Sequence, residues 1–165
     1  MKFTTKVVIA QPRQRVLELI MDPYRLSQWQ PGIKSVDLLT GHKDQPGARS
    51  RVAFELRGIR LEAIETVVKR QPPEVFSATY EARGVKNLVE NRFYEEGPGQ
   101  TRWVMDNTFE FSRLMSVGAI FVQDLIAKHT LEAMNRFKAF AEGIDDLGVS
   151  FILSIPEQRR NFKVF

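Results

Sequence analysis

The sequence predicts an α+β fold in which a seven-stranded antiparallel sheet curls around one long C-terminal helix. Seven segments are rich in β-branched and alternating apolar residues, a pattern that is typical of strands. Short turns separate six of these segments in succession, which favours an antiparallel meander. The apolar period then lengthens to that of a helix, and only this last helix is long enough to cover an apolar face of the sheet.

The N-terminal part of the chain is expected to form one strand and two short helices. β-Branched side chains cluster over residues 2–10, which predicts the first strand. An apolar face over residues 13–21 predicts a short helix. Asp22 and Pro23 are typical of a helix start, so a second short helix should follow and extend to about Trp29.

The remaining strands and the long helix follow from turn residues and periodicity. Glycine and proline mark the turns between six strands, which are expected over residues 33–40, 49–56, 60–70, 75–82, 86–95 and 101–111. Beyond Ser112 one helix face collects apolar residues and the other collects charged residues. Gly143 is well placed to end this helix.

Composition excludes several classes of protein. The 165 residues fit one domain, expected over residues 1–143, with a C-terminal extension over 144–165. The 24 basic and 20 acidic residues are scattered, so nucleic-acid binding is not expected. The absence of cysteine excludes disulfides, thiolate metal sites and cysteine nucleophiles, and a reducing cytoplasm is the expected location. No apolar run approaches the ~20 residues of a membrane span, so no integral membrane segment is expected.

Several motifs occur in an order and spacing that resemble those of a known superfamily. They are Pro12 with Val16 and Ile20, Asp22-Pro23 with Leu26, Trp29 and Pro31-Gly32, Gly47-Ala48, Pro72-Pro73, Gly99-Gln100-Thr101, and Phe137-Lys138 to Glu142. Over residues 2–143 the chain resembles the polyketide cyclase/dehydrase and lipid-transport superfamily, also called SRPBCC or START-like, which shares the helix-grip fold of the birch pollen allergen. The resemblance implies a cavity between the sheet and the long helix, but no particular reaction.

The candidate ligand-binding residues come from the inward face of the sheet, the long helix and the rim of the expected cavity. They are Trp29, Phe54, Leu61, Glu65, Val89, Asn91, Phe93, Trp103, Met105, Asn107, Ile126 and His129. The strand period of two places the sheet members on one face. Glu65, Asn91 and Asn107 are polar residues on this apolar wall and are expected to orient a ligand; the alternatives are that they bond to one another or to buried water, or that a bulge moves them to the surface.

Two of these residues carry open alternatives of their own. By the resemblance, Trp29 lies at or under the cavity rim, where it either contacts a ligand or fills the core beneath the two short helices. His129 lies at the edge of the apolar stripe of the long helix and is either a proton donor and acceptor or a structural residue. Glu65 and His129 are therefore the only candidates for catalytic proton transfer.

The leading hypothesis is binding of a hydrophobic small molecule such as a lipid, isoprenoid or aromatic polyketide. The alternatives are a polyketide cyclase or dehydratase, in which Glu65 or His129 moves protons and Asn91 or Asn107 holds a carbonyl, and a protein-interaction module. Whether the protein is an enzyme stays open. The two histidines are far apart in sequence, so neither a metal nor a cofactor is expected.

The C-terminal extension contains the apolar stretch VSFILSI, which is too short for a membrane span and too hydrophobic for a free tail. Phe151, Ile152, Leu153 and Ile155 are expected to pack against the outside of the domain or against a second subunit, which would make a homodimer; the alternative is a frayed chain end. Phe121 and Leu125 are expected to form a second apolar patch on the long helix.

Overall fold

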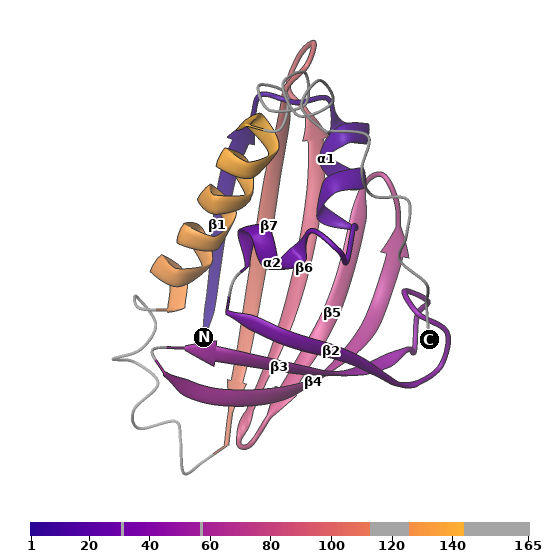
Figure 1. Ribbon diagram of the computed structural model, residues 1–165, viewed down its shortest axis with the longest axis vertical. Helices are drawn as coiled ribbons and strands as arrows, with labels where there is room; N and C mark the ends of the chain where they lie inside the picture. The colour runs from indigo at the N-terminus through magenta and orange to yellow at the C-terminus, as the bar shows by residue number, and fades with distance from the viewer. Residues whose placement is uncertain (31, 57, 113–125, 144–165) are drawn as a thin grey trace, which may run out of the picture.

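The computed structural model describes residues 1–30, 32–56, 58–112 and 126–143 (Figure 1). The elements in chain order are β1 (Lys2–Ile9), α1 (Arg13–Ile20), α2 (Leu26–Trp29), β2 (Ile33–Thr40), β3 (Arg49–Leu56), β4 (Ile59–Gln71), β5 (Val75–Ala82), β6 (Val85–Glu95) and β7 (Thr101–Phe111). Residues 126–143 are helical and are called the C-terminal helix below. The predicted fold class is confirmed.

All seven strands form one antiparallel sheet with the order β1-β7-β6-β5-β4-β3-β2. The chain leaves β1 at one edge, passes through α1 and α2, and returns at the opposite edge as β2. Figure 1 shows β2, β3 and β4 sweeping across the direction of β1, β6 and β7, as expected for a strongly twisted sheet. The C-terminal helix lies alongside β1, and α1 and α2 lie on the same side of the sheet.

The predicted start of the second short helix is wrong by several residues. Asp22 does not begin α2, because its carboxylate accepts a hydrogen bond from the Tyr24 backbone N–H at 2.9 Å. The Asp22 carbonyl accepts another from the Arg25 N–H at 3.2 Å. These bonds close a separate turn, and the helix begins only at Leu26. An aspartate side chain stabilises turns as readily as helix starts, so the sequence pattern is compatible with both.

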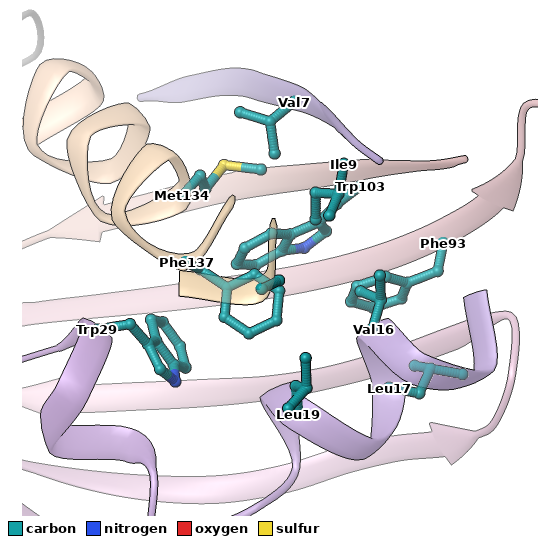
Figure 2. Packing of buried hydrophobic residues seen from close by; sticks show 11 residues of the cluster. Val7, Ile9, Val16, Leu17, Leu19, Trp29, Phe93, Trp103, Met134 and Phe137 are labelled. Carbon is teal, nitrogen blue, oxygen red and sulfur yellow. The ribbon is translucent and has the colours of Figure 1, made fainter. Parts of the chain in front are cut away.

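The core forms where the two short helices and the end of the C-terminal helix meet β1, β6 and β7. Figure 2 shows the Phe137 ring between the rings of Trp29 and Trp103. The ring centroids of Phe137 lie 5.0 Å from Trp29 and 5.4 Å from Trp103, both in edge-to-face contact. Trp103 also stacks on Phe93 at 5.7 Å. Other buried members are Ile9, Val16, Leu19, Met134 and Ala141.

Hydrogen bonds fasten the end of the C-terminal helix to the connection between β1 and α1. The Glu142 carboxylate accepts from the Ala10 N–H and from the Lys138 ammonium group, both at 2.7 Å. The Gln11 side-chain amide donates to the Ala141 carbonyl at 3.2 Å. Because carbonyls of the last helical turn have no partner within the helix, this amide also caps the helix end. No helix in the described part of the chain is both long and apolar enough to cross a membrane.

Candidate functional site

The strand register defines one inner face of the sheet, which packs against the helices. Trp103 in the core lies directly opposite Phe93 on β6 and Val7 on β1. Since directly opposed residues share a face, the alternate residues of every strand can be assigned from this pair. The candidate residues of the sheet all fall on this face: Phe54, Leu61, Glu65, Val89, Asn91, Phe93, Trp103, Met105 and Asn107.

The candidate residues divide into two groups along this face. Four are buried in or beside the core, namely Trp29, Asn91, Phe93 and Trp103, and Asn107 is buried farther along β7. Asn91 accepts a hydrogen bond from the Trp103 indole N–H at 2.8 Å, so the carboxamide oxygen has a protein partner. Trp29 is 5% exposed and packs on Phe137, which places it in the core. Direct ligand contact by these four residues stays a prediction.

The second group lies nearer the opposite end of the face, where apolar side chains are incompletely covered. Phe54 and Val89 are half-buried, and Leu61 is 39% exposed. Met105 is half-buried too, at the border of this group, where it packs against the core. Val36 and Leu38 on β2 share the inner face and are exposed as well. Large apolar side chains normally avoid water when they gather on one face, so this part of the sheet suits an apolar ligand.

A row of polar residues crosses this less covered part of the inner face. Ser50 on β3, Glu65 on β4, Tyr80 on β5 and Asn87 on β6 are successive register partners. The Tyr80 hydroxyl donates a hydrogen bond to Glu65 Oε1 at 2.6 Å. These four residues, together with Asn107 on β7, are called the polar row below.

Asn87 and Asn107 end the polar row with unused hydrogen-bonding capacity. Asn87 Nδ2 donates to Asn107 Oδ1 at 3.1 Å. Asn87 Oδ1 and Asn107 Nδ2 are buried and have no hydrogen-bond partner among the described residues. A buried polar atom without a partner costs about 1–3 kcal/mol. One free acceptor and one free donor therefore lie on neighbouring strands.

Tyr80 remains a hydrogen-bond donor over a wide pH range. Burial raises the pKa of its hydroxyl well above the ordinary value of 10.0, and the Glu65 charge and the hydrogen bond to Glu65 raise it further. The phenol therefore stays protonated and directs its proton to Glu65 Oε1. Glu65 Oε2 accepts no hydrogen bond from the described residues, so it is free to accept one from a ligand.

The two candidate residues on the C-terminal helix are Ile126 and His129. Their positions define the site less closely than those of the sheet residues. His129 Nδ1 lies 3.2 Å from Glu132 Oε2 on the next helical turn. His129 Nε2 is buried without a hydrogen-bond partner among the described residues, and Ile126 one turn earlier is half-buried. No hydrogen bond or ion pair joins His129 to Glu65, Asn91 or Asn107 within the described ranges. The two candidates for proton transfer are therefore not assembled into a pair.

Three members of the polar row, Tyr80, Ser50 and Asn87, are not among the candidates from the sequence, and Tyr80 is the one that bonds to a candidate carboxylate. The alternation on β5 leaves its inner face ambiguous, whereas the register with β4 and β6 assigns Phe76, Ala78 and Tyr80 to it. The available signal was the expected inward position of Glu65, because a buried carboxylate requires a hydrogen-bond donor on an adjacent strand. Across the described ranges no three histidine, aspartate or glutamate side chains are grouped to hold a metal ion.

A separate surface groove of about 480 Å³ lies along α1. It is lined by Arg13, Gln14, Leu17, Glu18, Met21, Pro73 and Glu95. An ion pair between Arg13 and Glu95 at 3.3 Å joins its two sides. None of the candidate ligand-binding residues lines it.

Solved structures with this fold cover most of the chain. A START superfamily protein from Mycobacterium smegmatis is 18% identical with a TM-score of 0.72, over 87% of this chain and 98% of that one. The Zhui aromatase/cyclase from Streptomyces sp. R1128 is 15% identical with a TM-score of 0.72, over 87% and 94%. The protein TTHA0849 from Thermus thermophilus is 18% identical with a TM-score of 0.70, over 91% and 99%.

At these identities the structural likeness shows a shared fold and nothing about activity. No curated protein sequence matches the chain. A match between the sequence and a protein family shows family membership, which structural likeness at these identities does not. Residues 1–144, which include both short helices, all seven strands and the C-terminal helix, match a single family. The chain belongs to the polyketide cyclase/dehydrase and lipid-transport family.

Proposed function

We propose that the protein binds a hydrophobic small molecule, such as a lipid, an isoprenoid or an aromatic polyketide, between the inner face of the sheet and the C-terminal helix. The observation that carries the proposal is the polar row among the incompletely covered apolar side chains of the inner face. Its free acceptor on Asn87 and free donor on Asn107 are costly in an empty protein, and a ligand with one polar end would satisfy them.

The proposed contacts separate into apolar and polar groups. Phe54, Leu61, Val89 and Met105 would contact the hydrocarbon part of the ligand, because they are incompletely covered and share one face. Its polar end would lie at the polar row, in contact with Asn87 and Asn107 or with Glu65, which is two strands away from Asn87. Ile126 and His129 would approach the ligand from the C-terminal helix, and the buried Trp29, Asn91, Phe93 and Trp103 would form the inner end of the site.

Family membership supports this proposal in general terms. The family description includes lipid transport as well as polyketide cyclisation and dehydration, and each of these activities requires a site for a largely apolar molecule. The expected cytoplasmic location and the homodimer remain predictions, which cell fractionation and light scattering would check.

A titration with the neutral dye Nile red tests the proposed function. We expect saturable binding with one dye per protein. Met105→Trp should weaken it at least tenfold, because the larger ring would occupy the inner face. Val104→Trp is the matched control, since Val104 lies on the opposite face of β7. Absence of saturable binding to the wild-type protein, or equal effects of the two variants, would contradict the proposal.

A second candidate is a cyclase or dehydratase activity at the same place. The observation that favours it is a carboxylate and two amides on the same face of the sheet, with Glu65 on β4 and Asn87 and Asn107 on β6 and β7. In a cyclisation, Glu65 would take a proton from a carbon next to a carbonyl, and Asn107 Nδ2, three strands away, would donate to a different carbonyl oxygen of a polyketide long enough to reach from β4 to β7. The carbon would then attack a second carbonyl, whose oxygen would receive the proton back from Glu65.

Turnover of a polyketide mimic by the wild-type protein, and its loss in Glu65→Gln, would support this second candidate, provided that the variant still binds Nile red. Binding of the mimic without any conversion would leave ligand binding as the function.

A further inference from the structure

We infer that this site selects ligands whose polar end is neutral or cationic and donates hydrogen bonds, and that it discriminates against carboxylates such as fatty acids. The inference rests on the proposed function and specifies its ligand. It is carried by the charge distribution on the inner face and by the unused atoms of the polar row.

Three charged side chains share the inner face of the described sheet, and two of them have ion partners. Arg70 lies 3.4 Å from Asp44, and Glu95 lies 3.3 Å from Arg13. Both lie toward the α1 end of the sheet, and Arg70 is five positions after Glu65 on β4, a span of roughly 16 Å. Neither pair is placed to neutralise Glu65.

Glu65 has no cationic partner within 4.0 Å among the described residues. The groups beside it on the inner face are Ser50 and Tyr80, which are its direct register partners. Tyr80 satisfies Oε1 with a neutral hydroxyl, which solvates the charge without cancelling it. The polar row therefore presents negative charge to a ligand.

The hydrogen-bonding inventory favours the same ligand class. Within the described ranges, Glu65 Oε2 and Asn87 Oδ1 are acceptors without a donor, whereas Asn107 Nδ2 is a donor without an acceptor. An alcohol can donate to Asn87 Oδ1 and accept from Asn107 Nδ2, and an ammonium group can donate to either acceptor. An ionised carboxylate only accepts, so it would leave both acceptors unsatisfied and would be repelled by Glu65.

Displacement of Nile red by three probes with the same chain length tests the inference. The probes are decan-1-ol, decylamine and decanoate at about pH 8, where the amine is charged and the acid is ionised. We expect decylamine and decan-1-ol to displace the dye at concentrations at least tenfold below that of decanoate. In Glu65→Gln the preference for decylamine over decanoate should fall at least tenfold.

Two further variants complete the test. Glu62→Gln removes the same charge from the opposite face of β4 and should leave the preference unchanged. Tyr80→Phe removes the donor to Glu65, so the bare carboxylate should keep or widen the preference against decanoate. This variant keeps the inference testable if Glu65→Gln does not fold.

The outcomes separate this inference from the proposed function. Decanoate binding as tightly as decylamine, or an unchanged preference in a folded Glu65→Gln variant, would overturn the inference and leave hydrophobic ligand binding intact. A reversed preference in Tyr80→Phe would overturn it in the same way. Failure of the wild-type protein to bind Nile red would overturn both.

Discussion

Tyr80 on β5 donates a 2.6 Å hydrogen bond to Glu65 on β4, and both side chains lie on the inner face of the sheet. The bond directs one neutral donor to one carboxylate oxygen and leaves the other oxygen open. It therefore places a polar contact within a largely apolar face while keeping Glu65 available to a ligand.

This pair predicts a loss of stability at alkaline pH. Burial and then the Glu65 charge raise the pKa of Tyr80 in the folded state, so its proton is bound more tightly than in the unfolded chain. The stabilisation is complete below the ordinary tyrosine pKa of 10.0 and is lost as the pH rises from there through the folded-state pKa. Chemical denaturation at increasing pH should show a steeper decline for the wild type than for Tyr80→Phe. Parallel declines would show that Tyr80 is not responsible.

Trp29→Ala should destabilise the fold by about 3–5 kcal/mol, because the ring is fully packed against Phe137. Urea denaturation measures the change in unfolding free energy. Tyr24→Ala is the control, since Tyr24 is an aromatic residue 91% exposed and its removal should change stability by no more than about 0.5 kcal/mol. Similar values for the two variants would remove Trp29 from the core.

The hydrogen bond between Trp103 and Asn91 predicts a coupling between two substitutions. Asn91→Leu should cost about 1–3 kcal/mol, because it leaves the buried indole N–H without an acceptor. Adding Trp103→Phe to this variant removes the orphaned donor. In a double-mutant cycle the two changes should therefore cost less together than the sum of the single variants. Simple additivity would indicate that the bond contributes nothing.

The hydrogen bonds of Glu142 at the end of the C-terminal helix predict that the folded protein loses stability in acid. Burial acts to raise its pKa, but the hydrogen bonds from Lys138 and the Ala10 N–H, with the Lys138 charge, outweigh burial and lower the pKa below the ordinary 4.5. The stabilisation is present above that ordinary value and is lost as the pH falls through the folded-state pKa. The stability difference between wild type and Glu142→Gln should shrink in acid. A difference independent of pH would contradict this account.

The segment 144–165 lies outside the described residues, as do Phe121 and Leu125, so the expected packing of the extension stays a prediction. The described part of the C-terminal helix ends at residue 143, near the connection between β1 and α1. Truncation after Gly143 should lower solubility, alter the oligomeric state or lower the melting temperature. An unchanged, monodisperse and equally stable protein would show that the apolar stretch has no structural partner.

Most of the fold could be predicted because strands and turns depend mainly on residues that are close together in the sequence. Alternation and turn residues placed the strand limits within one residue of those observed, including β2 at residues 33–40 and β7 at residues 101–111. The start of α2 was misplaced because Asp22 can bond to backbone N–H groups of a turn or of a helix, and its neighbours in space decide which.

The site was less predictable because it depends on pairing between strands. A period of two places Glu65 and Asn107 on one face, but hydrogen-bond partners depend on register and side-chain rotamer. The bonds from Tyr80 to Glu65 and from Asn87 to Asn107, and the two amide atoms left unpartnered, follow only from the observed pairing. The role of Trp29 could not be predicted for the same reason. The sequence is compatible with both core packing and ligand contact, and the choice depends on its neighbours in space.

The central claim is that a hydrophobic molecule occupies the inner face with its polar end at the polar row. A crystal structure of the protein with decan-1-ol tests it most directly. We predict density for the hydroxyl within hydrogen-bonding distance of Glu65 Oε2 or Asn107 Nδ2, and for the chain against Val89 and Met105. An inner face filled by protein side chains, or decan-1-ol bound only in the groove along α1, would contradict the claim.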